Sequence, residues 1–212
     1  MPSANLNHKS RSLIVFGAGG HGRVVADAAL LTERWMKIIA TDGKASACQG
    51  VLLPGVELIE EKIAFNLNSE MHIAIGSNLA RQKIAATWGN DRLESVVHPS
   101  ASVSLFSKIG SGSFVAAGAV VGPAAELGHC VIVNHGAVVE HDVFIGNFSH
   151  VSTKASLGGH VMVGLRVLIG SGVVVLPSKV IGNDVTVCAG SVVDANLLEP
   201  GTYAGIPARK IL

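Results

Sequence analysis

Aromatic and charged side chains are both scarce in this chain of 212 residues. Aromatic residues make up 4% of the chain and charged residues 15%, whereas glycine occurs 25 times. Few rings and many glycines favour a thin, turn-rich architecture over a bulky globular core. The net charge of +1 gives no sign of a surface for nucleic acid or for an anionic membrane.

Cysteine is also rare, and long apolar segments are missing. The three cysteines are far apart, and none belongs to a Cys-x-x-Cys pair, which indicates reduced thiols in an intracellular protein. Residues 1–11 are polar and lack the apolar stretch of a signal peptide, so we expect them to form a flexible tail. Apolar stretches elsewhere are interrupted by Gly, Asp and His, which argues against a membrane-spanning helix. The sequence thus predicts a cytoplasmic protein without a membrane partner.

What the chain has in abundance is a strict repeat of six residues. An apolar residue stands at every sixth position, without insertion, seventeen times from Val97 to Val193. A helix has a period of about 3.6 and an ordinary strand a period of about two, so neither explains the repeat. Hexapeptide repeats are typical of a parallel β-helix, in which each short strand sends one aliphatic side chain into a narrow core.

The repeat also restricts the positions around the core residue. The residue after the core aliphatic is often glycine, which we expect to adopt the unusual φ of a tight turn. These glycines are Gly110, Gly122, Gly128, Gly146, Gly158, Gly164, Gly170 and Gly182. The fifth position is small or β-branched, as a crowded corner requires. Three hexads make a triangular coil of 18 residues, so residues 18 apart should lie above one another at a spacing of about 4.8 Å.

The first half of the chain follows a different pattern. Apolar runs at 13–16, 37–41 and 71–75 predict strands, and 20–31 and 80–88 predict helices, the first with an apolar stripe of Val24, Val25, Ala28 and Leu31. This order is typical of a small α/β domain with a parallel sheet. The predicted organisation is a tail at 1–11, an α/β domain at 12–94, a β-helix at 95–196 and a capping segment at 197–212.

A glycine-rich motif follows the first predicted strand. The residues from Gly17 to Gly22 match G-x-G-x-x-G, open the first helix, and are followed after 20 residues by Asp42. Such glycines let backbone N–H groups approach phosphates at the positive end of a helix. A domain of this size is half of a dinucleotide-binding fold, so a nucleotide-linked ligand is favoured over NAD. A motif that only tightens the turn remains an alternative.

A second group of residues falls on one corner of the predicted coil. His141 and Asp142 are adjacent, and adding 18 places Gly159 and His160 on the same corner one coil further along. A histidine of this kind can accept a proton from an attacking amine or hydroxyl, while the acid orients the ring. The backbone N–H of Gly159 can hold a thioester oxygen as it becomes an oxyanion. A solvated turn histidine is the competing interpretation, because His129 and His135 occupy the same position of the hexad.

Other chemistries find less support in the sequence. His150 is out of phase with His141, and the pattern alone predicts a surface or interface histidine. No two histidines of the repeat region stand five residues apart, as the zinc sites of gamma-class carbonic anhydrases need, so we expect no metal site. The chain has no Gly-x-Ser-x-Gly elbow, which favours direct transfer in a ternary complex over a covalent acyl-enzyme.

Four segments together resemble a known family over nearly the whole chain. They are VFGAGGHGRVVADAA, VVHPSASVS, VNHGAVVEHDVFIGNFSHVS and YAGIPARKIL. In this order they are similar to the hexapeptide-repeat acetyltransferases of nucleotide-linked sugars, which include sialic-acid O-acetyltransferases and N-acetyltransferases of nucleotide-linked 4-amino-4,6-dideoxyhexoses. The resemblance implies a left-handed β-helix, a homotrimer, and acetyl-CoA bound along the cleft between neighbouring β-helices.

The resemblance also implies roles for single residues. His141 matches the catalytic base and Asp142 the acid beside it, where many relatives have Glu. The cofactor-binding positions correspond to His150, near the acetyl-CoA thioester, together with Gly159 and His160. The nucleotide-linked sugar is expected at Gly19, Gly20, His21, Asp42, Gly76 and Asn78.

The expected reaction is transfer of an acetyl group from acetyl-CoA to the 4-amino group of a nucleotide-linked amino sugar. Relatives that bind UDP often carry two consecutive acids after the second strand, whereas this chain has Asp42 followed by Gly43. The resemblance therefore favours a GDP-linked sugar, of the perosamine type, and no metal. A UDP-linked amino sugar, a sialic-acid-type O-acetyl transfer and a non-enzymatic nucleotide-binding scaffold are the alternatives.

Overall fold

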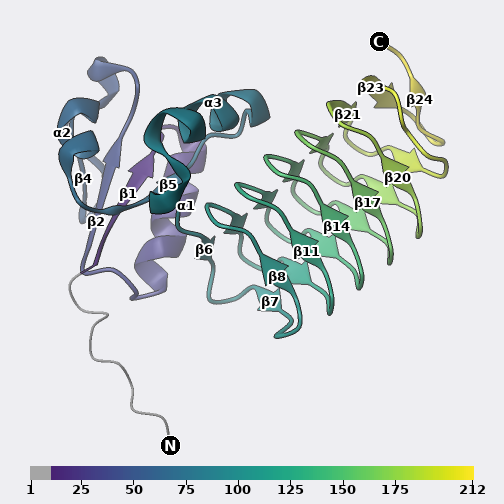
Figure 1. Cartoon of the computed structure of the whole chain (residues 1–212), viewed down its shortest axis with the longest axis horizontal. Coiled ribbons are helices and arrows are strands. Elements are labelled where there is room, and N and C mark those ends of the chain that lie inside the picture. The colour runs from purple at the N-terminus through teal and green to yellow at the C-terminus, as the bar shows by residue number, and fades with distance from the viewer. Residues whose placement is uncertain (1–10) are drawn as a thin grey trace, which may run out of the picture.

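The computed structural model describes residues 11–212, so residues 1–10 of the expected tail lie outside the described residues. The first part is a five-stranded sheet with helices on both faces (Figure 1). Its elements are β1 (Ser12–Phe16), α1 (Gly20–Leu31), β2 (Lys37–Thr41), β3 (Val51–Leu53), β4 (Val56–Leu58), α2 (Glu61–Asn66), β5 (Glu70–Ile73) and α3 (Asn78–Trp88), with 3-10 turns at Ala45–Ala47 and Asn90–Arg92. None of the described helices is long and apolar enough to cross a membrane.

The strand order of this sheet is β3-β4-β2-β1-β5, with β1 parallel to both β2 and β5. Alternate residues of β1 face opposite ways, as in any strand. Leu13 and Val15 pack with α1, while Ile14 and Phe16 pack with α2 and α3. The predicted all-parallel sheet is wrong at its edge, because β3 pairs antiparallel with β4. The pattern also missed β3, β4 and α2, whose short runs are only partly buried.

The predicted apolar stripe of α1 is correct only in part. Val25 and Ala28 are buried, but Val24 is half-buried and Leu31 is 53% exposed. Ala26 and Ala29 are buried instead. The helix is covered on two sides, by the sheet and by the β-helix, so its buried face is wider than a single stripe and is rotated away from Leu31.

The second part is a three-sided parallel β-helix, as the repeat of six predicts. Paired strands are displaced by 18 residues, for example Val121 with Val139 and Leu127 with Ile145, so each coil lies above the last. The aliphatic residues of the repeat form one continuous core along the stack. Because each coil buries little by itself, this core exists only through stacking of neighbouring coils.

The three faces of the stack are three separate sheets. The docked face contains β6 (Val96–Val97), β9 (Phe114–Val115), β12 (Ile132–Val133), β15 (His150–Val151), β18 (Leu168–Ile169) and β21 (Val185–Val187). The first open face contains β7 (Ser102–Val103), β10 (Val120–Val121), β13 (Val138–Val139), β16 (Ser156–Leu157), β19 (Val174–Val175) and β22 (Val192–Val193). The second open face contains β8 (Lys108–Ile109), β11 (Glu126–Leu127), β14 (Phe144–Ile145), β17 (Met162–Val163) and β20 (Val180–Ile181).

The reason proposed for the glycines after each core aliphatic is wrong. These glycines do not have positive φ; a Cβ at Gly110 would lie 2.5 Å from the carbonyl carbon of Gly128 in the next coil. They are therefore required by close approach of the backbones. The left-handed conformation occurs two residues later, where ordinary residues such as Asp142 and His160 adopt φ of 58° and 59°. The small fifth position is buried as expected, as at Ser113, Ala119 and Ala155.

The last residues do more than form a loop over the open end. β23 (Gly201–Ala204) continues the docked face by pairing parallel with β21, and β24 (Arg209–Lys210) pairs antiparallel with β23. The Tyr203 ring and Ala208 join the core of the stack. These strands cap the last coil with hydrogen bonds and apolar contact (Figure 1).

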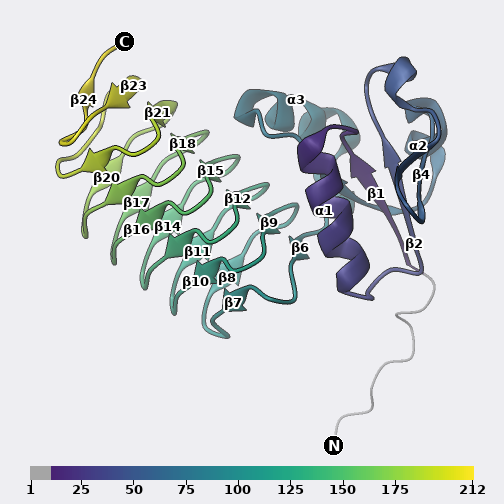
Figure 2. The same cartoon turned by 180° about the vertical axis from the view of Figure 1, so that it is seen from behind.

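The two parts are packed together through the docked face. Val96, Phe114 and Ile132 share an apolar core with α1 and the sheet, while Cys130 and Phe148 pack with residues of α3 and β1. Figure 2 shows α1 beside β6 and β9. Since these residues are fully or almost fully buried, the α/β part has a fixed place on the β-helix.

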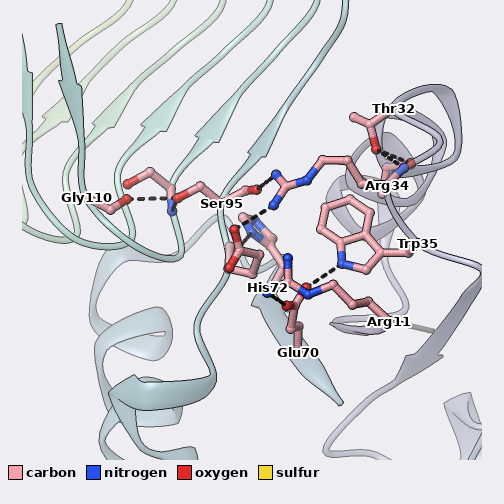
Figure 3. Close-up of polar contacts among 11 residues, drawn as sticks. Arg11, Thr32, Arg34, Trp35, Glu70, His72, Ser95 and Gly110 are labelled. Carbon is pink, nitrogen blue, oxygen red and sulfur yellow. Dashed lines mark hydrogen bonds and ion pairs between the residues drawn. The ribbon is translucent and has the colours of Figure 1, made fainter. Parts of the chain in front are cut away.

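Polar contacts at the junction add to this packing (Figure 3). Arg34 donates to the Ser95 carbonyl at 3.3 Å and pairs with Glu94 at 2.8 Å. The Ser95 hydroxyl in turn donates to the carbonyl of Gly110 in the first coil at 2.9 Å. The Nδ1 atom of the buried His72 lies 3.0 Å from the Glu94 carbonyl oxygen. The segment that links the two parts is thus hydrogen-bonded on both sides.

Candidate active site

The turns between the two open faces form one edge of the stack, which we call the dyad corner. His141 and Asp142 lie there, between β13 and β14, and the His141 Nδ1 atom is 2.8 Å from Asp142 Oδ2. A carboxylate only accepts hydrogen bonds, so Nδ1 carries the proton and Nε2 has a free lone pair. His129 and His135 lie on the other two corners, so the shared hexad position places the three rings at three different edges of the coil.

Gly159 lies against the His141 ring, one coil further along, as the count of 18 predicts. A Cβ at Gly159 would lie 2.6 Å from both Nε2 and Cε1 of His141, so only glycine leaves room for the ring. In the described part of the chain, the N–H of Gly159 donates to no other group. Nε2 of His141 and an unused N–H therefore occupy the same small region.

His160 completes this corner. Its ring meets the His141 ring edge to face at 5.2 Å, and its Nε2 lies 3.9 Å from Asp142 Oδ2. One ligand atom from each of His141, Asp142 and His160 lies within 4.8 Å of the others, so a divalent cation would fit here. Such an ion would compete for Nδ1 of His141 with the hydrogen bond to Asp142. The spacing rule used for the sequence did not anticipate this cluster, since it considered histidines alone.

The glycine-rich motif has two kinds of glycine. A Cβ at Gly22 would lie 1.8 Å from the Gly17 carbonyl oxygen, and Gly17 itself has φ of 128°, so the fold needs both. At Gly19 and Gly20 a Cβ would meet nothing within 4 Å, so these two leave open space at the start of α1. No side chain caps this helix end, and its N–H groups are available to an anion.

The motif lies where the order of the sheet reverses. β1 leads to β2 on one side, whereas β5 lies on the other side, and ligands of α/β sheets bind in the crevice at such points. Gly19, Gly20 and His21 follow β1, and Gly76 follows β5, so the structure brings these predicted residues to one end of the sheet.

Asp42 supports the glycine-rich turn directly. Its carboxylate accepts hydrogen bonds from the Ala18 N–H at 2.9 Å and from the Lys44 N–H at 3.0 Å. A hollow of about 290 Å³ lies beside it, lined by Asp42, Gly43, Glu60, Glu61 and Lys62. Asp42 is thus both a structural acceptor and part of a hollow at the end of β2.

His21 and His150 meet between the two parts of the chain. Their rings are stacked at 6.5 Å, and the edge of His21 faces Phe114 at 5.5 Å. Burial lowers the pKa of His21 to about 3 and that of His150 to about 4, so both are neutral at physiological pH. Within the described residues, His21 Nε2 is buried without a hydrogen-bond partner, which leaves it free for a ligand. His150 is the interface histidine that its phase in the repeat predicts.

Asn134 is a polar residue that the sequence reasoning missed. Its Nδ2 lies 3.2 Å from His150 Nε2, and its Oδ1 accepts from the His135 backbone at 2.9 Å. Asn134 therefore holds Nε2 of His150 as an acceptor. It stands 16 residues before His150 in the sequence, and only the coil of 18 residues, counted between neighbouring positions, could have related the two.

Arg81 is a second residue that the sequence did not single out. It is fully buried, yet it donates only to uncharged oxygens: the carbonyls of Ile75, Gly76, Cys130, Phe148 and Ser149 and the Asn78 amide oxygen. Burial lowers the pKa of Arg81 to about 10, so it stays charged at neutral pH. One side chain thus ties the turn after β5 to the coil that carries His150.

Asn78 also serves this junction. Its Nδ2 donates to the carbonyls of Arg166 and Val167, both at 3.0 Å, and its Oδ1 accepts from Arg81. The predicted contact of Asn78 with a ligand would have to use what these bonds leave free. Next to it lies a cavity of about 350 Å³ between α3 and the docked face, lined by Gly76, Ser77, Asn78, Leu79, Arg166, Leu168, Asp184 and Thr186. Arg166 is paired with Asp184 through two contacts, at 2.7 and 2.6 Å, so its charge is already balanced.

The predicted residues therefore fall into two groups. His141, Asp142, Gly159 and His160 are at the dyad corner, whereas Gly19, Gly20, His21, Gly76 and His150 are at the docked face. In a triangular coil, the corner between the open faces is opposite the docked face. A single copy of the chain separates the two groups by the width of the stack.

Comparison with known proteins agrees with both parts of the fold. Residues 12–88 match the family described as the PglD N-terminal domain. The acetyltransferase domain of PglB from Neisseria gonorrhoeae FA1090 is 34% identical over 95% of this chain and 100% of that chain, with a TM-score of 0.88. That domain has also been solved in complex with acetyl coenzyme A, at 35% identity and the same coverage.

A second relative is PerB from Caulobacter crescentus, solved in complex with CoA and GDP-perosamine. It is 31% identical over 94% of this chain and 97% of that chain, with a TM-score of 0.83. The chain belongs to the hexapeptide-repeat acetyltransferases of nucleotide-linked sugars. This confirms the family, the small α/β domain followed by a left-handed parallel β-helix, and the expectation that the chain is an enzyme. WeeI from Acinetobacter baumannii AYE, at 18% identity and a TM-score of 0.65, shares the fold.

Proposed function

We propose that this acetyltransferase moves the acetyl group of acetyl-CoA to the 4-amino group of a GDP-linked 4-amino-4,6-dideoxyhexose of the perosamine type. The hydrogen bond from His141 Nδ1 to Asp142, which leaves Nε2 as an acceptor beside Gly159, is the observation that carries this proposal. The complexes of the two relatives, one with acetyl coenzyme A and one with CoA and GDP-perosamine, support the donor and the class of acceptor.

The chemistry follows from the order of the groups at the dyad corner. The neutral amine attacks the thioester carbonyl carbon, and His141 Nε2 accepts the proton that the new C–N bond makes acidic. The Gly159 N–H stabilises the carbonyl oxygen while it carries negative charge. When the tetrahedral intermediate collapses, the C–S bond breaks, and the CoA thiolate takes the proton from His141. The products are the amide and free CoA.

The nucleotide part of the acceptor is proposed to bind at the glycine-rich turn. Gly19 and Gly20 leave open space, the first N–H groups of α1 point toward the phosphates, and Asp42 borders the hollow for the nucleoside. His21 has a free Nε2 at the end of this crevice, next to His150. The sugar would then lie against the docked face, with the acetyl-CoA thioester near His150.

The distance between the two groups of residues implies that copies share their sites. The dyad of one copy has to meet the docked face of its neighbour, because its own docked face is on the opposite side of the coil. A ring of three copies, with acetyl-CoA in the cleft between neighbouring β-helices, satisfies this for every dyad at once. We therefore propose a homotrimer with His141 and Asp142 acting on the substrate held by the next copy.

A complementation assay tests the shared site. One variant, His141→Ala, lacks the base, and a second, Gly20→Trp, fills the open space at the substrate turn. Mixed trimers formed from both should recover acetyl transfer, since some sites combine an intact dyad with an intact turn. Separate trimers of either variant should stay at the level of each alone. Recovery that requires no mixing, or no recovery after mixing is verified by mass, would contradict the shared site.

The acceptor is tested with matched substrates. GDP- and UDP-linked 4-amino sugars and a free sialic acid are offered with acetyl-CoA, and the acetylated product is measured by mass spectrometry. Transfer to the GDP-linked amine with the highest kcat/KM supports the proposal. A preference for the UDP-linked amine would correct the nucleotide, and transfer only to a hydroxyl would replace N-acetylation by O-acetylation.

A further inference from the structure

The first turn of the dyad corner carries two unusually exposed apolar side chains. Leu105 and Phe106, between β7 and β8, are 97% and 80% exposed. The corresponding turn positions of the later coils hold Pro123 and Ala124, His141 and Asp142, Gly159 and His160, and Pro177 and Ser178. No other coil presents large apolar groups at these two positions. An exposed aliphatic and aromatic pair of this kind marks a contact surface.

The turn itself is well fixed by hydrogen bonds. The Ser104 hydroxyl accepts from the Phe106 N–H at 3.2 Å, and the Ser104 carbonyl accepts from the Ser107 hydroxyl at 2.7 Å. The backbone that presents Leu105 and Phe106 is therefore ordered, and little conformational entropy is lost when a partner covers them.

Leu105 and Phe106 stand 36 residues before His141 and Asp142, which is two full coils. They therefore lie on the same corner as the dyad, about 9.6 Å nearer the α/β end of the stack. Because they share this corner, they face the neighbouring copy whenever the dyad does. The part of the neighbour that lies at their level decides what they contact.

α1 of a copy runs along its docked face against the rise of the coils. Its first turn is at the level of β15, where His21 stacks on His150, and the helix packs against β6 (Figure 2). From His21 to Leu30 the helix covers about 14 Å, close to the three coil steps from β15 to β6. The end of α1 exposes Leu30 and Leu31, which are 41% and 53% exposed.

We propose that Leu105 and Phe106 of one copy pack against Leu30 and Leu31 of the neighbouring copy. This rests on the shared site proposed above, with an assembly axis parallel to the stack. The two contacts then have matching separations: the dyad meets the neighbour's His21 end of α1, and the Leu105–Phe106 turn meets the Leu31 end. The apolar contact fixes the height of each dyad on its neighbour and so positions His141 over the substrate.

Sedimentation velocity over a range of protein concentrations tests this contact. In the double variant Leu105→Ser/Phe106→Ser, half-assembly should need at least a tenfold higher concentration than in the unchanged protein. A matched control, Val51→Ser, removes a side chain that is 64% exposed on the edge strand β3 and should leave assembly unchanged. Thermal unfolding of the dissociated chains should not change, because neither exposed side chain supports the fold.

A charge pair tests the two sides together. Leu105→Glu and Leu31→Lys should each weaken assembly, and the combined variant should regain at least a tenfold part of the loss. Assembly of the Ser/Ser variant equal to that of the unchanged protein, or a combined variant no tighter than the two single ones, would overturn the inference while leaving the shared site standing. An unchanged protein that is active as a monomer would overturn both.

Discussion

The His141 ring lies against the α-carbon of Gly159, so closely that a methyl group there would be 2.6 Å from Nε2. Gly159→Ala should therefore push the ring out of place. We expect kcat to fall at least tenfold, because a general base contributes about 10²-fold or more only when it is well placed. The same change at Gly172, a turn glycine with open space around it, should leave kcat unchanged in steady-state assays. A Gly159→Ala enzyme with normal kcat would exclude His141 as the base.

The base itself is tested by His141→Asn. Asparagine keeps a polar group at the corner but accepts no proton, so kcat should fall much more than KM for acetyl-CoA rises. An amine needs little activation once it is neutral, so a residual rate that increases with pH should remain. Rates are measured from pH 6 to 9 in both proteins; identical pH profiles of kcat would contradict proton transfer to His141.

The glycine-rich turn gives a matched pair of variants. Gly20→Ala places a methyl group in open space within the first helical turn, so stability should be unchanged or rise by up to about 1 kcal/mol, while KM for the nucleotide-linked sugar rises. Gly22→Ala places the methyl group 1.8 Å from the Gly17 carbonyl oxygen and should destabilise the fold by several kcal/mol. Urea unfolding and saturation kinetics measure both. An unchanged KM in Gly20→Ala would remove the turn from the substrate site.

Three buried histidines make stability depend on pH. Burial lowers the pKa of His21 to about 3 and those of His72 and His150 to about 4, against about 6.5 in the unfolded chain. Below pH 6.5 the unfolded chain binds protons that the folded chain excludes. Stability is therefore complete above pH 6.5 and falls as the pH drops toward 4, by up to about 1.4 kcal/mol per unit for each histidine.

Urea unfolding at pH 7.5, 6, 5 and 4.5 measures this slope. Replacing the fully buried His72 by Gln should reduce the slope, whereas His129→Gln, at an exposed turn, should leave it unchanged. Stability that does not change between pH 7.5 and 4.5 would show that these histidines are not buried together.

Metal ions should inhibit this enzyme without being required by it. Dialysis against EDTA is expected to leave acetyl transfer unchanged, since the proposed steps use only side chains, backbone and acetyl-CoA. Added Zn²⁺ should lower kcat, because it competes at His141, Asp142 and His160 for the hydrogen bond of the dyad. Inhibition is followed by titration and reversed with EDTA. Loss of activity after chelation, with recovery on adding metal, would contradict the metal-free mechanism.

The sequence predicted most where the period of six applies. A strict repeat fixes the register of every coil, and counting by 18 relates His141 to Gly159 without any knowledge of tertiary structure. The same count gave the wrong reason for the glycines of the repeat, because close approach between coils and left-handed φ lie two residues apart. The period says how coils stack and nothing about which backbone atoms meet.

The rest depends on how the two parts of the chain dock. Arg81, Asn134 and His150 come together only because α3 and the glycine-rich turn are packed on one particular face of the coil. No local pattern encodes that choice of face. An arginine in a helix is usually solvated, and here it is buried because carbonyls from both parts surround it.

The most direct test is a transfer assay with the unchanged protein. Acetyl-CoA and a GDP-linked 4-amino-4,6-dideoxyhexose are incubated with the enzyme, and the acetylated product and free CoA are measured together by mass spectrometry. The account predicts one amide formed for each CoA released, with loss of most of this rate in His141→Asn. No acetylated sugar, or an equal rate in His141→Asn, would contradict it.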